Sequence, residues 1–138
     1  MFQVSMLTKC RHLMSSKSIN DFIDTYLSGW KLGDGELSLS ATAEDFYYDD
    51  PNTGRIQREE FVEFVNDFKS AAVEMGAEKN ARPFLDYCDT VIKDDELPAT
   101  VWCWWQARGT SLQGSAVIKV GELGVISERI AYFSRLPE

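Results

Sequence analysis

The stretch TVWCWWQARGTSLQGSAVIKVGELGVISERIAYF, residues 100–133, decides the fold. Apolar and polar residues alternate along it with the period of two that is typical of β-strands. We predict strands at 100–108, 114–120 and 125–133, and one more strand at 84–93 before them. Short connections rich in Gly and acidic residues separate the strands, so consecutive strands should be antiparallel neighbours in one sheet.

Upstream of the strands, apolar residues recur with a helical period instead. A helix is predicted from the N-cap Ser18 to Gly33, a short helix at 36–42 and a long helix at 58–75. A short aromatic strand is predicted at 46–50, because aromatic side chains suit a pleated surface. Helices followed by a meander predict an α+β domain, with the helices packed on one face of a curved, mainly antiparallel sheet.

The chain has the size of one domain with a tail. Its 138 residues are 44% hydrophobic and 26% charged, which is typical of a globular protein. The ordered pattern begins after Met14, so residues 1–15 are expected to form a flexible tail and residues 16–138 the domain. Met14 is an alternative to Met1 as the true start.

Charge and composition exclude several classes of function. Fourteen basic against 22 acidic residues give a net charge of −8, which disfavours binding to nucleic acids and to anionic membrane surfaces. No apolar stretch has the roughly 18 residues that a membrane-spanning helix needs. The one histidine, His12, lies in the expected tail, so Ser-His-Asp triads, Cys-His pairs and most zinc sites are excluded from the domain. The three cysteines form no CxxC pair, and we expect a soluble, cytoplasmic protein.

The pair Asp49-Asp50 before Pro51 is the first candidate for chemistry. Adjacent residues of a strand point to opposite sides of a sheet, so only one of the two carboxylates can face the core. An Asp before Pro often starts a turn, which is the structural interpretation. In the functional interpretation, the carboxylate lies at the rim of an aromatic cavity, where burial raises its pKa toward the range of a general base.

Tyr26 and Glu128 are the other two candidates. Tyr26 lies on the apolar stripe of the first helix, where its hydroxyl either meets a core partner or points into a cavity. In the last strand Glu128 shares a face with apolar residues, and a carboxylate in such a place is rarely left unpaired. It either pairs across the sheet with Arg108 or Lys119 or lines a pocket.

Three tryptophans mark the strand at 100–108. Trp102 and Trp104 share one face of this strand, and Trp105 lies on the other. The pattern indicates a pocket wall on one side and a subunit interface on the other, with ordinary core packing as the alternative. We assign Trp102 and Trp104 to the pocket wall.

Four segments carry a resemblance to a known family. They are Leu32-Gly33-Asp34, EDFYYDDP at 44–51, Gly109-Thr110, and GVISER at 124–129 with Tyr132-Phe133. In order and spacing they resemble a SnoaL-like member of the nuclear transport factor 2 (NTF2) superfamily, over about residues 16–133. The resemblance implies a cystatin-like cone that encloses an apolar pocket and dimerises through the outer face of the sheet.

The resemblance also implies roles for individual residues. In the ketosteroid isomerases of this superfamily an Asp is the base, and a Tyr with a protonated Asp forms the oxyanion hole. The matching Tyr is Tyr26, seven residues before Gly33, and the matching base is Asp50, directly before Pro51. The positions that match the face of Glu128 look into the pocket. We assign the pocket lining to Trp30, Tyr48, Phe61, Trp102, Trp104, Ile130 and Tyr132.

One part of the isomerase pattern is missing. The second acid of the oxyanion hole should lie on the strand after Gly109-Thr110, but residues 109–121 contain no Asp or Glu. An enolate would then have one strong donor, Tyr26, and the loss of one such donor typically costs about 10²–10³ in rate. Steroid isomerase activity is therefore not expected.

Two functions remain after these exclusions. The first is a cofactor-independent isomerase or cyclase for a hydrophobic carbonyl compound, in which Asp50 removes a proton, Tyr26 binds the oxyanion and Glu128 is a second acid/base or an orienting group. The second is a non-catalytic ligand-binding or dimeric assembly module, in which Asp50 caps the turn at Asn52 and Thr53. Neither function calls for a cofactor or a metal. Both imply a hydrophobic small molecule and a second copy of the chain as partners.

Overall fold

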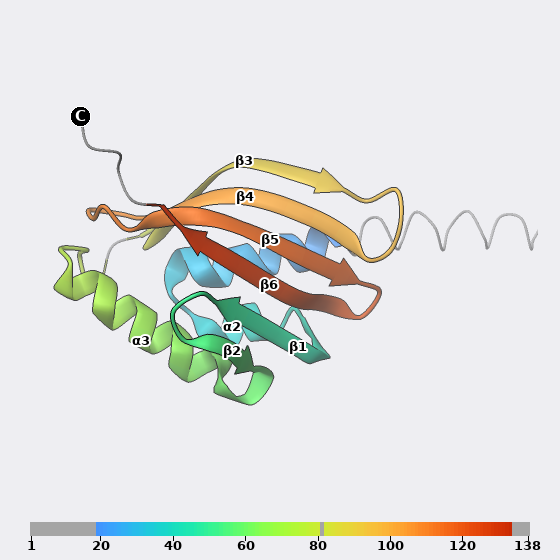
Figure 1. Cartoon of the computed structure of the whole chain (residues 1–138), viewed down its shortest axis with the longest axis horizontal. Helices are drawn as coiled ribbons and strands as arrows, with labels where there is room; N and C mark the ends of the chain where they lie inside the picture. The colour runs from blue at the N-terminus through green and yellow to red at the C-terminus, as the bar shows by residue number, and fades with distance from the viewer. Residues whose placement is uncertain (1–18, 81, 134–138) are drawn as a thin grey trace, which may run out of the picture.

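The computed structural model describes residues 19–80 and 82–133, in which helices pack on one face of a curved sheet (Figure 1). The strands are β1 (Thr42–Asp50), β2 (Gly54–Gln57), β3 (Leu85–Lys93), β4 (Ala99–Ala107), β5 (Gln113–Gly121) and β6 (Gly124–Tyr132). Within the described residues they form one sheet in the order β2-β1-β6-β5-β4-β3. This arrangement confirms the expected α+β fold with a mainly antiparallel sheet.

The helices are held together at their first connection. They are the helix at 19–32, α2 (Gly35–Leu39) and α3 (Phe61–Glu74), which follows a 3₁₀ turn at Arg58–Glu60. The Ser38 hydroxyl on α2 donates to the main-chain oxygen of Tyr26 at 2.7 Å. Gly29 makes this approach feasible, because a Cβ atom there would lie 2.0 Å from Ser38 Oγ. This contact holds the helical turn that carries Tyr26 against α2.

The first strand differs most from the expectation. It begins at Thr42, where the short helix was expected to continue, and runs parallel to β6, with Tyr48 opposite Glu128. The strand β2 was not expected and pairs with the end of β1. Turn composition predicted a turn at 51–54, and the turn covers 51–53, because Gly54 already begins β2. The four residues of β2 are too few to show a period.

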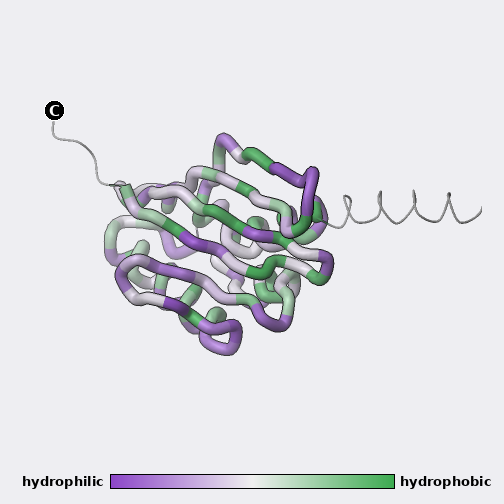
Figure 2. Tube along the Cα trace, turned by 45° about the vertical axis from the view of Figure 1, so that its right-hand side comes forward, coloured by the Kyte–Doolittle hydropathy of each residue, from purple (hydrophilic) through white to green (hydrophobic). Residues whose placement is uncertain are grey.

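The core lies between the helices and the inner face of the sheet. Buried and less buried residues alternate along β4 and β5. Figure 2 shows hydrophobic and hydrophilic segments along the strands of this sheet. Phe61 is fully buried, and its ring centroid lies 5.1 Å from that of Phe46 and 5.7 Å from that of Trp30. The helices therefore pack on the sheet through aromatic rings.

Some expectations concern parts of the chain that the structure does not describe. The tail at 1–15, the alternative start Met14 and the N-cap Ser18 lie outside the described residues. Across 19–80 and 82–133, no helix has the length and apolar character needed to cross a membrane.

Candidate functional site

A buried carboxyl and a buried phenol meet in the interior of the cone. Glu128 on β6 points inward from between Tyr48 on β1 and Ile118 on β5, and it is only 2% exposed. The Tyr26 hydroxyl, from the helix at 19–32, donates a hydrogen bond to Glu128 Oε1. This hydrogen bond joins two of the predicted candidates, which lie 102 positions apart in the sequence. The alternative partners Arg108 and Lys119 do not pair with Glu128.

The surroundings of Glu128 favour its neutral form. Burial raises its pKa from 4.5 to about 7, although the nearby Tyr26 hydroxyl and Trp30 indole lower it in part. The pKa of Tyr26 is raised well above 10, first by burial and then by the negative charge of Glu128. At neutral pH the phenol therefore keeps its proton, while the carboxyl lies close to half ionisation.

Trp30 adds an unsatisfied donor to this region. Its indole ring is 1% exposed, and its Nε1 is the one buried side-chain nitrogen or oxygen, among the described residues, without a hydrogen-bond partner. Its N–H lies close enough to lower the pKa of Glu128, but it makes no hydrogen bond of acceptable geometry. Trp30 was predicted to line the pocket, but no sequence pattern indicates that its indole N–H lacks a hydrogen-bond partner.

A small hollow lies beside Glu128. Its volume is about 10 Å³, and its lining residues are Trp30, Tyr48, Phe68, Leu85, Tyr87, Trp105, Glu128 and Ile130. A hollow of this size has room for about one water molecule. Aromatic side chains fill most of the space in which the resemblance implied a pocket.

The hollow corrects part of the expected lining. Trp30, Tyr48 and Ile130 line it as expected, whereas Phe61 lies in the aromatic core and Tyr132 lies farther along β6. Phe68, Leu85, Tyr87 and Trp105 line it and were missed.

The assignment of Trp102 and Trp104 to the pocket wall is wrong. They lie on the outer face of the sheet, 43% and 48% exposed, and Trp105 faces inward in their place. The sequence already indicated this. Gln106 and Arg108 lie on the same face of the strand as Trp102 and Trp104, and such polar residues are typical of the face toward solvent.

Asp50 faces inward but has a different set of partners. It is 4% exposed, and its Oδ1 accepts hydrogen bonds from the main-chain N–H groups of Asn52 at 2.7 Å and Thr53 at 3.0 Å. Its Oδ2 accepts a hydrogen bond from the Tyr132 hydroxyl at 2.6 Å. The structure thus brings Tyr26 together with Glu128 and Asp50 together with the turn, and no hydrogen bond joins Asp50 to Tyr26.

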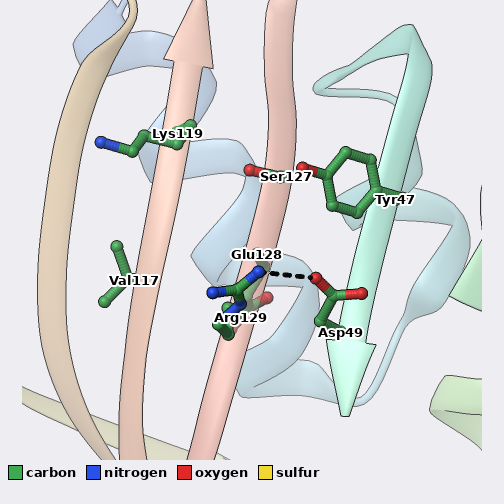
Figure 3. A pocket seen from close by; sticks show the side chains of 7 residues that line it. All are labelled: Tyr47, Asp49, Val117, Lys119, Ser127, Glu128 and Arg129. Carbon is green, nitrogen blue, oxygen red and sulfur yellow. Dashed lines mark hydrogen bonds and ion pairs between the residues drawn. The ribbon is translucent and has the colours of Figure 1, made fainter. Parts of the chain in front are cut away.

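A second concavity lies on the outer face of the sheet, and Figure 3 shows its lining. It has a volume of about 270 Å³. Asp49 forms ion pairs there with Arg55 at 2.9 Å and Arg129 at 3.3 Å, and the hydrogen bond from Arg55 lowers the pKa of Asp49. Lys119 Nζ donates to Thr100 Oγ1 at 2.6 Å. Because its charged groups largely satisfy one another, this concavity is a polar margin of the outer face.

Metal-binding groups do not gather in the described part of the chain. Within 19–80 and 82–133, no three His, Cys, Asp or Glu side chains lie close enough to hold a metal ion. The chemistry available in the interior is therefore that of a carboxyl with a raised pKa, a phenol and an indole N–H.

Comparison with known proteins identifies the fold. No protein-family model and no curated protein matches the chain. A solved structure from Xanthomonas campestris pv. campestris, provisionally assigned as a polyketide cyclase, is 16% identical, with a TM-score of 0.60 over 85% of this chain and 91% of that chain. A Kribbella flavida protein, provisionally assigned as a ketosteroid isomerase, is 14% identical, with a TM-score of 0.57 over 88% and 82%.

A third structure shows how broadly the architecture is shared. A protein of unknown function with a cystatin-like fold, from Nostoc punctiforme, is 14% identical, with a TM-score of 0.61 over 90% of this chain and 95% of that chain. NTF2-like proteins from Cytophaga hutchinsonii and Shewanella baltica also match. The chain therefore has the cystatin-like fold of the NTF2-like proteins.

Proposed function

We propose that the protein is a cofactor-independent proton-transfer enzyme for a small, hydrophobic carbonyl compound, with Glu128 as the acid and base. The observation that carries this proposal is the Glu128–Tyr26 pair beside an aromatic hollow. A carboxyl with a pKa of about 7 is suited to accept and return a proton at neutral pH. Two structural relatives provisionally assigned as a polyketide cyclase and a ketosteroid isomerase support the same class of reaction.

The roles differ from those implied by the resemblance. Glu128 removes a proton from the carbon next to the carbonyl group. Tyr26 does not line the hollow; its hydroxyl binds Oε1 and orients the carboxyl, which leaves Oε2 for the ligand. Asp50 holds the turn at Asn52 and Thr53, because its oxygens already accept three hydrogen bonds. A ligand larger than water requires the aromatic lining to move apart. A cytoplasmic location is part of this proposal.

The test uses exchange of hydrogen for deuterium in 2-tetralone, a neutral aromatic ketone with acidic protons next to its carbonyl. In D₂O, NMR should show that the wild-type protein accelerates this exchange. We expect Glu128→Gln to slow the catalysed exchange by about 10²–10⁴-fold, the usual contribution of a general base. Asp50→Asn is the matched control and should retain the activity, because an amide oxygen can still accept from the turn.

Two outcomes would contradict the proposal. The first is exchange by the wild-type protein that is no faster than in buffer. The second is loss of exchange in Asp50→Asn with retention in Glu128→Gln, which would return the role of the base to Asp50.

The outer face of the sheet favours a second candidate function, a dimeric assembly module. Trp102, Trp104 and Phe133 are partly exposed there, and the rings of Trp104 and Phe133 lie 4.9 Å apart. An apolar patch of this kind marks an interaction surface. The small volume of the inner hollow also fits a module that does not turn over a ligand.

We propose a second copy of the chain as the partner of this surface. Polar and charged side chains flank the tryptophans on both sides. They are Lys119 and Arg129 on β5 and β6, and Asp86 and Lys93 on β3. A two-fold axis that runs along β4, in the plane of the interface, would bring the tryptophans of the two copies together and place each flank against the opposite flank of the other copy. Such a contact is self-complementary, as a two-fold interface requires.

Substitution of the tryptophans tests this interface. The double variant Trp102→Thr/Trp104→Thr should sediment as a monomer under conditions in which the wild-type chain is a dimer, because it loses the largest apolar side chains of the patch. Leu123→Ser is the control, since Leu123 is exposed at a hairpin tip away from the patch. A wild-type monomer at all concentrations, or a dimeric double variant, would exclude this interface.

A further inference from the structure

We propose that the Trp30 indole N–H binds a single oxygen atom beside Glu128 in the inner hollow. In the free protein this is the oxygen of a water molecule that also contacts the Glu128 carboxyl, and in the complex it is the carbonyl oxygen of the ligand. The ligand part of this inference rests on the proposed function, and the water part does not. Trp30 thereby becomes a residue that contacts and orients the substrate.

The first argument is the unsatisfied donor. A buried N–H group without an acceptor destabilises a protein, so nearly all such groups in native proteins have a partner. The Nε1 of Trp30 is buried without one, whereas the Nε1 of Trp105, which lines the same hollow, donates to the main-chain oxygen of Ser115 at 3.2 Å. An acceptor from outside the described protein groups would remove this cost for Trp30.

The second argument is the composition of the surroundings. The rings nearest to Trp30 are those of Phe68 at 5.5 Å, Tyr48 at 5.6 Å and Phe61 at 5.7 Å. The polar groups near Trp30 are the hydroxyls of Tyr48 and Tyr26 and the Glu128 carboxyl, and none of them accepts a hydrogen bond from Nε1. The acceptor must therefore come from the space beside these residues.

The third argument is the hollow itself. Trp30 and Glu128 both line it, and its volume of about 10 Å³ accommodates one water molecule. A water there can accept a hydrogen bond from the indole N–H and donate one to the carboxyl, as a buried water usually does with its polar neighbours. One oxygen atom at this point thus satisfies both side chains.

The same geometry indicates the chemical class of the ligand. No Lys or Arg is among the described residues that line the hollow, and Glu128 would repel an anion. A neutral ketone or aldehyde has the right chemistry once the aromatic lining moves apart, because its oxygen accepts from the Trp30 N–H while its apolar body contacts the rings of Tyr87 and Trp105. Carboxylate and phosphate ligands do not fit.

Proton transfer in this arrangement balances without any co-reactant. The Glu128 carboxylate takes a proton from the carbon next to the carbonyl, the electron pair of the C–H bond forms a C=C bond, and the carbonyl oxygen becomes an enolate oxygen that accepts from the Trp30 N–H. The Glu128 carboxyl then returns the proton to a carbon of the enolate, which regenerates the carboxylate.

The water is tested first, in the wild-type protein and without any ligand. With ¹⁵N-labelled tryptophan, the indole proton of Trp30 should show a nuclear Overhauser cross-peak to a long-lived water molecule. The indole proton of Trp105 is the internal reference and should show a weaker cross-peak, because it donates to the main-chain oxygen of Ser115. Absence of the Trp30 cross-peak would overturn the water site, whatever the activity.

The ligand role is tested with Trp30→Phe and the matched control Trp102→Phe, using 2-tetralone exchange. We expect Trp30→Phe to slow exchange by about 10²–10³-fold, as for the loss of one oxyanion donor. Trp102→Phe should change the exchange much less, because Trp102 is exposed on the outer face of the sheet. Wild-type exchange in Trp30→Phe, with loss in Glu128→Gln, would overturn this inference and leave the proposed function intact. Unchanged exchange in Glu128→Gln would instead overturn the proposed function.

Discussion

Replacing Gly114 with Ala is expected to destabilise the protein by about 3 kcal/mol or more, because overpacking at rigid main-chain contacts lies at the upper end of such effects. Gly114 lies in β5 opposite Tyr132 of β6. A Cβ atom at this position would lie 1.8 Å from the main-chain oxygen of Ala131 and 2.7 Å from the Trp105 ring. Neither neighbour can move alone, since one belongs to the paired strand and the other to the wall of the hollow.

Gly121→Ala is the matched control for this prediction. Gly121 lies in the same strand, and its added Cβ atom would come no closer than 3.5 Å to a side chain, which is ordinary contact. Urea unfolding followed by tryptophan fluorescence should show a lower midpoint for Gly114→Ala and a change of less than about 1 kcal/mol for Gly121→Ala. Equal stability of the two variants would show that β5 and β6 are not paired in this register.

The sheet could be predicted from the sequence because its signal is local. Strands β4 and β5 carry a clear period of two, and short turns separate β3, β4, β5 and β6. The four predicted strands match the observed ones within about one residue at each end. The parallel contact between β1 and β6 could not be predicted in the same way. It joins residues about 80 positions apart, such as Tyr48 and Glu128, and no local pattern encodes that distance.

The sequence was sufficient to predict individual residues of the candidate site but not which of them are in contact. Alternation identified Glu128 as a carboxylate on an apolar face, and helical spacing placed Tyr26 on the buried stripe. Which phenol meets which carboxylate depends on the rotation of the first helix against the sheet, and the contact between Ser38 and the main chain of Tyr26 sets that rotation. Alternation predicted that only one of Asp49 and Asp50 faces the core, and in the structure this residue is Asp50. Its hydrogen bonds to the turn match the structural alternative.

Glu128 should also make the stability of the protein depend on pH in the direction opposite to most carboxyl groups. Its pKa is about 7 in the folded protein and 4.5 as the ordinary value, so between these pH values the folded state binds more protons than the unfolded state. Unfolding free energy therefore falls as pH rises through this window, and the contribution is constant above and below it. A difference of this size corresponds to about 3 kcal/mol, as an order of magnitude.

Glu128→Gln isolates this effect, because the amide has the same shape and does not titrate. The unfolding free energy of the variant minus that of the wild-type protein should increase by about 3 kcal/mol between pH 4.5 and pH 8, as measured by urea unfolding at each pH. Leu123→Ser, at the exposed β5–β6 turn, changes no titrating group and should give a difference that does not vary with pH. A flat difference for Glu128→Gln would mean that its carboxyl is hydrated when folded. A hydrated carboxyl would not have the raised pKa on which the proposed catalysis depends. The dependence of unfolding free energy on pH therefore tests the site without knowledge of the substrate.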